Sequence, residues 1–205
     1  MGLYRHCVFP YLLDLAMGSR VLAKPRQRTL ARATGRILEI GFGTGRNLPH
    51  YPRAVRRIEA IDPDTDLDRY SQPRIAAAGI EVDFHHLNAE RLPFEPDRFD
   101  TVVCTLTLCS IADVVHALGE VRRVLKPGGR FLFLEHGLSP DAGVARWQRR
   151  LEPIQRRIAG GCHLARDTVA LVKQSGLQLL DAEHYYLRGV PRFGGYLTEG
   201  SAQKS

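Results

Sequence analysis

The sequence is poor in cysteine and has no long apolar run. Its four cysteines, Cys7, Cys104, Cys109 and Cys162, are scattered and form no Cys-x-x-Cys pair. This excludes a disulfide framework and leaves no spacing typical of a metal site. We therefore predict a reducing, cytoplasmic setting and no bound metal. The longest weakly polar stretch, residues 102–118, falls short of the ~18 apolar residues that a membrane-spanning helix needs.

Acidic residues are also fewer than basic ones: the chain has 22 Asp and Glu and 29 Lys and Arg, which gives a net charge of +7. The basic residues gather at 20–36, 53–57 and 146–157, a distribution that favours anionic partners. Most of them are expected to be solvated helix faces. They do not alternate with aromatic residues and form no recognised RNA-binding module, so no nucleic-acid partner is expected. Peripheral contact with a membrane surface stays open, and no obligate protein partner is inferred.

The composition, with 44% hydrophobic residues among 205, is typical of one globular domain. Pro10 and Asp14 interrupt the apolar N-terminus, so no signal peptide is predicted. We expect a single domain over residues 1–205, in which residues 1–34 form an N-terminal helical cap segment and residues 137–166 a cap insertion.

From residue 36 onward, short apolar runs alternate with longer periodic ones, which indicates an α/β fold. We predict a Rossmann-like, seven-stranded, mostly parallel sheet with helices on both faces, a C-terminal antiparallel hairpin and a small helical cap. Asp113 is expected to cap one helix, Asp167 or Thr168 to cap another, and Pro153 to bend or restart a third. The expected strands are 36–40, 57–61, 81–86, 99–104, 130–135, 177–187 and 194–203; the expected helices are 11–33, 44–50, 66–78, 113–125, 144–158 and 167–175.

A glycine-rich turn follows the first expected strand, in ILEIGFGTGRN (37–47). Gly41, Gly43 and Gly45 permit positive φ and let a ligand approach the backbone, beside free N–H groups. The third glycine lies four residues after the first, whereas a dinucleotide fingerprint needs five, and this spacing argues against NAD. Glu39, two residues before the turn, is placed to accept from an ammonium group on a ligand.

Two further segments point to a nucleoside. Asp62, at the end of the second expected strand, is placed to accept from both hydroxyls of a ribose. In HLNAERLPF (86–94), the amide of Asn88 and neighbouring backbone N–H groups are placed to contact an adenine edge. RFDTVVCTLTLCSIAD (98–113) and RRVLKPGGRFLFLEH (122–136) complete five segments in a fixed order.

In that order the segments resemble the class I S-adenosylmethionine-dependent methyltransferases. More narrowly, WQRRLEPIQRRIAGGCHLARDT (147–168), GFGTGRNLPHYP (41–52), VVCTLTLCS and the pair Glu135-His136 resemble the small methyltransferase-like enzymes that methylate alkyl thiols. This resemblance runs from about residue 9 to the C-terminus and implies a thiol acceptor, with S-adenosylmethionine as the methyl donor and S-adenosylhomocysteine as the product. The residues that the resemblance and the motifs assign to the cofactor are Glu39, Gly41, Phe42, Gly43, Thr44, Gly45, Asn47, Asp62, Pro63, Asn88, Ala89, Glu90, Cys104, Thr105 and Leu106.

The acceptor stays open at this level. The animal thiol methyltransferases are membrane-associated through an N-terminal hydrophobic anchor, which is not found here, and their Pro-His before the last Gly-x-Ala-x-Lys is absent from LTEGSAQK (197–204). Short phospholipid N-methyltransferases are similar too. Phosphatidylethanolamine or a specialised metabolite is therefore an alternative acceptor, and a cofactor-sensing protein without turnover is an alternative function.

Methyl transfer needs orientation and desolvation more than a strong base. His136 is the candidate that takes or steers the acceptor proton, and Arg166 the candidate that lends positive charge to a thiolate; His163 is a weaker candidate. Cys162 is expected to be a buried structural residue rather than to pair with its neighbour, and Cys104 and Cys109 are expected to line the core or the pocket wall.

Overall fold

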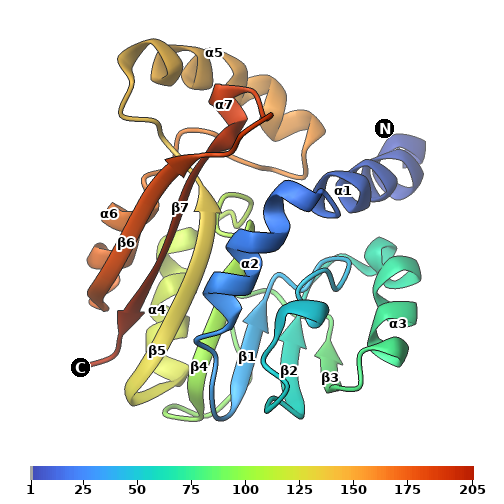
Figure 1. Cartoon of the computed structure of the whole chain (residues 1–205), viewed down its shortest axis with the longest axis vertical. Helices are drawn as coiled ribbons and strands as arrows, with labels where there is room; N and C mark the ends of the chain where they lie inside the picture. The colour runs from blue at the N-terminus through green and yellow to red at the C-terminus, as the bar shows by residue number, and fades with distance from the viewer. Residues whose placement is uncertain (1) are drawn as a thin grey trace.

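Within residues 2–205, which the computed structural model describes, seven strands form one sheet (Figure 1). The order is β3-β2-β1-β4-β5-β7-β6, in which neighbours from β3 to β5 are parallel and β7 is antiparallel to both β5 and β6. This confirms the predicted sheet and its C-terminal hairpin. The strands are β1 (Ile37–Ile40), β2 (Arg57–Ile61), β3 (Glu81–His85), β4 (Phe99–Thr105), β5 (Leu125–His136), β6 (Gln178–Tyr186) and β7 (Tyr196–Gln203).

Helices cover both faces of the sheet, as predicted. In Figure 1, α2 lies in front of the strands and α4 and α6 lie behind them, while α1, α5 and α7 lie beyond the upper edge. The helices are α1 (Phe9–Met17), α2 (Ala23–Leu30), α3 (Asp68–Ala77), α4 (Val114–Val124), α5 (Ala142–Ile158), α6 (Thr168–Gln174) and α7 (Arg192–Gly195), with short turns at Tyr4–Val8, Arg20–Leu22, Leu48–His50 and Thr65–Leu67.

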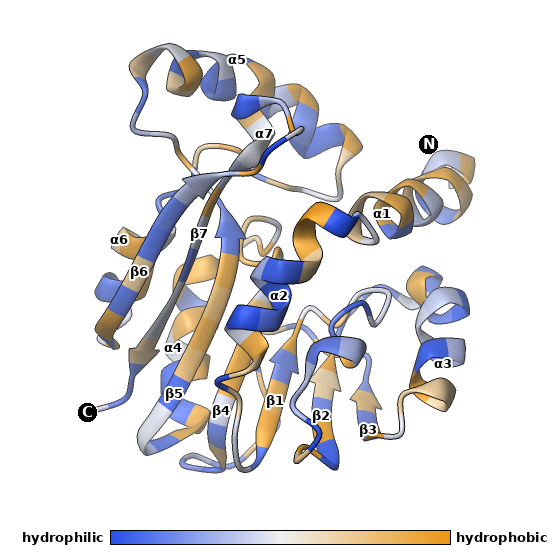
Figure 2. Ribbon diagram, in the orientation of Figure 1, coloured by the Kyte–Doolittle hydropathy of each residue, from blue (hydrophilic) through white to orange (hydrophobic). Residues whose placement is uncertain are grey.

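The central strands are apolar on both sides, because helices bury both faces of a parallel sheet. All four residues of β1 are buried, and Figure 2 shows the hydrophobic colour running along β1, β4 and β5. Phe99, Phe131 and Phe133 are fully buried in the larger apolar cluster beneath α4. Burial of each such side chain stabilises the folded state by about 1.5–3 kcal/mol. This packing holds in place the strand ends that carry the polar residues.

Local chemistry sets the helix starts. The carboxylate of Asp113 accepts from His116 N at 3.0 Å and begins α4, and that of Asp167 accepts from Ala170 N at 3.0 Å and begins α6, as predicted. Asp141 caps α5 in the same way.

Some predicted boundaries were wrong. The expected helix 11–33 is divided into α1 and α2, because the chain turns at Gly18 and Ser19 is extended. The expected helix 44–50 is only the short turn Leu48–His50, since glycines precede it and Pro49 has no N–H to donate. Pro153 lies inside α5 without ending it.

The fifth strand also begins earlier than expected, because Leu125 pairs with Phe99 before a bulge that contains the Pro-Gly-Gly turn. In residues 2–205, no helix is both long and apolar enough to span a bilayer.

Candidate active site

The glycine turn lies at the carboxyl end of β1. Gly41 N and Phe42 N donate to Ile61 O at 2.9 and 3.1 Å, which ties the turn to β2. Gly41 and Gly43 both have positive φ, 73° and 57°. A Cβ at Gly41 would lie 2.1 Å from the side chain of Thr107, whereas a Cβ at Gly43 would approach nothing closer than 3.9 Å. Gly41 is therefore needed for packing, and Gly43 leaves the backbone open to a ligand, as a cofactor cradle requires.

Asp62 holds this turn from the end of β2. Its Oδ2 accepts from Gly43 N at 2.8 Å, its Oδ1 accepts from Asp64 N at 2.9 Å, and the residue is 8% exposed. Burial raises the pKa of this carboxyl, and the two backbone donors oppose the shift. Because each carboxylate oxygen accepts more than one hydrogen bond, both oxygens keep capacity for ribose hydroxyls.

A buried polar network supports the turn from below. Glu39 accepts from Asn47 Nδ2 at 2.9 Å and from Tyr51 OH at 2.6 Å, while Arg26 donates to Asn47 Oδ1 and to Thr105 Oγ1. Burial raises the pKa of Glu39 to about 7. Each oxygen of Glu39 already accepts one hydrogen bond and the residue is 1% exposed, so in this structure Glu39 positions the turn. Its contact with a ligand ammonium group stays a prediction.

At the end of β3, hydrogen bonds within the segment and to α4 hold the residues that we expect to contact an adenine. Asn88 is exposed, and its Oδ1 accepts from Glu90 N at 2.9 Å. Glu90 in turn accepts from Asp113 N at 2.8 Å, which joins the segment to the start of α4. Ala89 is buried between them. The amide of Asn88 stays at the surface of the same edge as Asp62 and its exposed neighbour Pro63.

The ends of β4 and β5 are joined by one buried carboxylate. Glu135 Oε1 accepts from Thr107 N at 2.7 Å and from Leu108 N at 2.8 Å, and Cys104 Sγ lies 3.8 Å away. Leu106, with φ of 55°, supplies the reversal that aims these N–H groups at Glu135. Among residues 2–205, the other oxygen of Glu135, Oε2, has no hydrogen-bond partner.

A cluster that the sequence did not indicate lies beside the end of β5. His136 Nε2 lies 3.0 Å from Cys162 Sγ. The sulfur of Cys109 lies close to the same group, with one ligand atom from each of the three residues within 4.8 Å of the others. The neighbouring thiol of Cys109 and burial raise the pKa of the Cys162 thiol. Burial lowers the pKa of His136, but its contact with Cys162 outweighs this and the net direction is upward. Arg166 reaches this region and donates to Leu108 O.

His163, the weaker candidate, does not belong to this cluster. Its Nδ1 lies 2.8 Å from Glu152 Oε1 on α5, so its side chain holds the cap. Cys162 is buried, as predicted, and its sulfur lies against His136.

The N-terminal segment is attached to the cofactor turn by ion pairs that sequence patterns did not show. Asp14 of α1 accepts from Arg46 at 2.7 Å and from Arg74 of α3 at 2.7 Å, and Arg74 also donates to Thr44 O. Burial raises the pKa of Asp14, but the hydrogen bonds from these arginines lower it to about 2. One aspartate thus holds α1 over the glycine turn.

Substituting Asp14 with asparagine is expected to release α1. Hydrogen bonds to charged partners contribute ~1.5–3 kcal/mol each, so amide exchange in residues 9–17 should accelerate at least ~10-fold, the factor for 1.4 kcal/mol. In the unsubstituted protein the contact persists down to pH ~4 and is lost as the pH falls toward 2, because the folded pKa lies below the unfolded one. Exchange monitored by mass spectrometry, with Glu81→Gln as a surface control, measures both effects; unchanged exchange would contradict the clamp.

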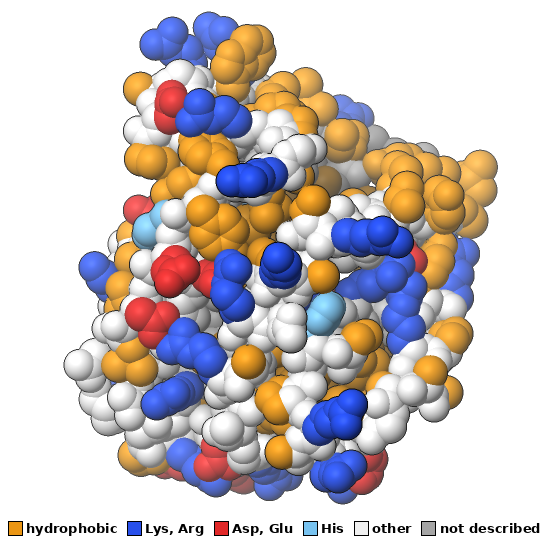
Figure 3. Space-filling model, viewed as in Figure 1, with side chains coloured by type: hydrophobic (Ala, Val, Ile, Leu, Met, Phe, Trp, Pro, Cys, Tyr) orange, Lys and Arg blue, Asp and Glu red, His pale blue; other side chains and the backbone are white. Residues whose placement is uncertain are grey.

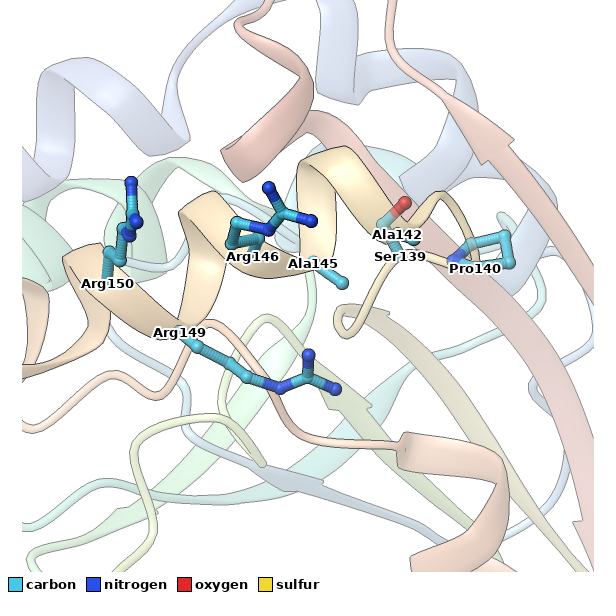
Figure 4. A pocket seen from close by; sticks show the side chains of 7 residues that line it. All are labelled: Ser139, Pro140, Ala142, Ala145, Arg146, Arg149 and Arg150. Carbon is cyan, nitrogen blue, oxygen red and sulfur yellow. The ribbon is translucent and has the colours of Figure 1, made fainter.

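Two surface hollows are lined by other residues than those of the candidate site. One, of about 590 Å³, lies along α5 beside Arg146, Arg149 and Arg150. In Figure 4 the Arg149 side chain points away from those of Arg146 and Arg150, so the three do not converge on one anion. The other, of about 660 Å³, lies at the amino ends of β1 and β2, around Arg36 and Arg57. Neither hollow is lined by the glycine turn, Asp62 or His136, and the second lies at the amino ends of the strands, opposite to where ligands of open α/β sheets bind, so neither is the candidate site.

Comparisons with known proteins agree with this geometry. The methyltransferase domain family matches residues 38–133. The thiol S-methyltransferase TMT1B of Homo sapiens is 34% identical over 180 residues, which cover 78% of this chain and 71% of that protein. TMT1B of Rattus norvegicus is 37% identical over 142 residues, covering 64% of this chain and 55%, about half, of that protein. The structure of a geranyl diphosphate methyltransferase in complex with S-adenosylmethionine has the same fold, with a TM-score of 0.68 at 17% identity over 89% of this chain and 84% of that one.

Proposed function

The chain belongs to the class I S-adenosylmethionine-dependent methyltransferases, and from this premise we propose that its acceptor is a small molecule with a thiol group. The observation that carries the proposal is the placement of His136, Cys162 and Arg166 at the ends of β4 and β5, beside the cofactor turn. The likeness to thiol S-methyltransferases supports the same acceptor class.

The cofactor would be held by the turn and by the neighbouring strand ends. The open backbone at Gly43, the carboxylate of Asp62 and the exposed amide of Asn88 fit a nucleoside with a ribose and an adenine. Phe42, Thr44 and Gly45 complete the turn, and Cys104, Thr105 and Leu106 form its wall at β4. When bound, S-adenosylmethionine supplies a methyl group already activated on a sulfonium sulfur.

This chain's residues then orient and desolvate the acceptor. A thiol with a pKa near ~8.5 is only a few per cent thiolate at neutral pH, so a neighbouring positive charge raises the reactive fraction. Arg166 supplies that charge, and His136 steers the acceptor sulfur toward the methyl group. The acceptor sulfur forms a new bond to carbon as the sulfonium bond breaks, and the thiol proton leaves to solvent or to a neighbouring base.

The two cap helices offer a surface suited to an amphiphilic acceptor or a membrane face. Leu12 and Leu15 of α1 and Trp147 and Ile154 of α5 are exposed, and Figure 3 shows hydrophobic side chains gathered over the N-terminal helix. Tyr4 OH donates to Ile158 O at 2.7 Å and joins the two segments. Because arginines adjoin these apolar groups on α5, peripheral contact with an anionic bilayer is part of the proposal.

One assay tests the acceptor. Purified protein is incubated with labelled S-adenosylmethionine and either an alkyl thiol or phosphatidylethanolamine vesicles. We expect labelled thioether, and a loss of about 100-fold in His136→Ala with cofactor affinity retained, since misplaced reacting groups cost rate rather than cofactor binding. His184→Ala, which alters a histidine bonded to Thr198 on the outer strands, serves as the matched control.

Labelled lipid without labelled thioether would replace the thiol acceptor by a phospholipid amine. Vesicle sedimentation in the same experiment measures membrane contact, which should weaken with salt. Absence of label from both acceptors would contradict the proposal, and undiminished turnover in His136→Ala would contradict the assignment of that histidine.

A further inference from the structure

The cluster beside the end of β5 contains three potential metal ligands, which the wall of a substrate pocket does not by itself require. Three soft or borderline donors converge there from separate elements: Cys109 from the loop after β4, His136 from the end of β5 and Cys162 from the loop after α5. One donor atom from each lies within 4.8 Å of the other two. In tetrahedral zinc coordination, donor atoms bound at ~2.1–2.3 Å are separated by roughly 3.6–3.8 Å, so small side-chain shifts close the cluster around a cation.

The surroundings of the two sulfurs fit thiolate ligands. Gln155 Nε2 lies 3.7 Å from Cys162 Sγ, and Ser110 Oγ lies 3.5 Å from Cys109 Sγ, so each sulfur has a polar neighbour able to donate to it. His163 N donates to Cys109 O at 2.8 Å and fixes the two cysteine loops to each other. Such outer contacts orient metal ligands.

The charge balance is also favourable. A divalent cation that displaces both thiol protons, which pass to solvent, forms a neutral group with two thiolates and a neutral imidazole. Glu135 and Arg166 both lie near His136 and act on it in opposite directions. The buried region therefore has the same net charge with or without the cation, and no unpaired charge is created by binding.

We infer that Cys109, His136 and Cys162 bind a thiophilic divalent cation, Zn²⁺ in the first instance, with a fourth coordination position open to the acceptor. Three protein ligands with an open position are typical of catalytic rather than structural zinc. An acceptor thiol that enters this position loses its proton to solvent and is held as a thiolate. This second part rests on the proposed thiol acceptor, and His136 then acts as a ligand.

A second group of potential ligands in residues 2–205, formed by Glu59, Asp83 and His85, does not share these features. The carboxylate of Glu59 is already paired with Arg36 at 2.8 Å and with Arg98 at 2.8 Å. Two guanidinium groups on one ligand oppose a cation, so this group carries no metal site.

The test measures metal directly, on full-length protein kept reduced. After exposure to Zn²⁺ and gel filtration, elemental analysis should find one zinc per chain in the unsubstituted protein and in Cys7→Ser, which changes an exposed cysteine. Cys109→Ser and Cys162→Ser should each weaken zinc retention at least tenfold. Substituting Co²⁺ should give thiolate charge-transfer absorption, and adding an alkyl thiol should change that spectrum without any methyl donor.

The outcomes separate the metal site from the proposed function. Thermal unfolding and S-adenosylmethionine binding establish that each variant is folded. Zinc retained equally by all variants, or by none of the proteins, would overturn the site, even if the protein forms thioether. A cobalt spectrum that alkyl thiol leaves unchanged would overturn the open acceptor position. Zinc binding without any thioether would leave the metal site standing and contradict the proposed acceptor instead.

Discussion

Substituting Asp62 with alanine is expected to weaken S-adenosylmethionine binding by about 30-fold or more. The substitution removes the acceptor for Gly43 N, which orders the cofactor turn, and both oxygens placed for the ribose. Two lost hydrogen bonds at ~1 kcal/mol each amount to about 2 kcal/mol, and 1.4 kcal/mol corresponds to a factor of ten. Calorimetric titration with S-adenosylmethionine and S-adenosylhomocysteine measures the change.

Asp97→Asn is the matched control, because Asp97 pairs with Lys204 outside the cofactor turn. The control should bind the cofactor as the unsubstituted protein does. Equal affinity of Asp62→Ala and the control would show that the cofactor lies elsewhere.

Substituting Glu135 with alanine is expected to lower the free energy of unfolding by about 2–6 kcal/mol. Thr107 N and Leu108 N both donate to Glu135 Oε1, and a buried N–H without a partner costs ~1–3 kcal/mol. The loss comes from leaving these two donors unsatisfied in the fully buried end of β5, so it should appear in urea unfolding at neutral pH.

Glu135→Gln separates this effect from simple truncation. Its amide oxygen keeps an acceptor for both N–H groups, so its loss should be clearly smaller than that of the alanine variant. If the two variants were equally destabilised, Glu135 would not be the acceptor that joins the ends of β4 and β5.

Much of the fold follows from local patterns. Apolar runs bounded by turn residues located the strands to within a few residues, apart from the early start of β5 at Leu125, because strands buried on both faces have a distinct composition. Asp113 and Asp167 were identifiable as caps, since a cap depends on the residues three positions away. The helix expected at 44–50 was wrong, because the glycines before it and the missing N–H of Pro49 leave only the short turn Leu48–His50.

The candidate site likewise has features that the sequence predicted and features that only the structure shows. The glycine spacing and Asp62 at a strand end are short-range features that indicated a nucleoside site, and the resemblance of five segments to the class I methyltransferases identified the nucleoside as S-adenosylmethionine. Glu39 illustrates the limit: its place before the turn suggested a ligand contact, but did not reveal that its oxygens also accept from Tyr51 and Asn47. The direction of a buried side chain depends on neighbours distant in sequence.

The sequence by itself determined the reaction class and the cofactor, through motifs that resemble a known family, and the mostly parallel α/β sheet, because apolar runs and turn residues are local features. Only the tertiary structure decided that Asp14 holds α1 over the cofactor turn and that Cys109, His136 and Cys162 meet. Those contacts join residues 26 to 60 positions apart, and no spacing rule anticipates them. They exist because the hydrophobic core fixes the ends of β1, β4 and β5 along one edge, which brings the loops after them together.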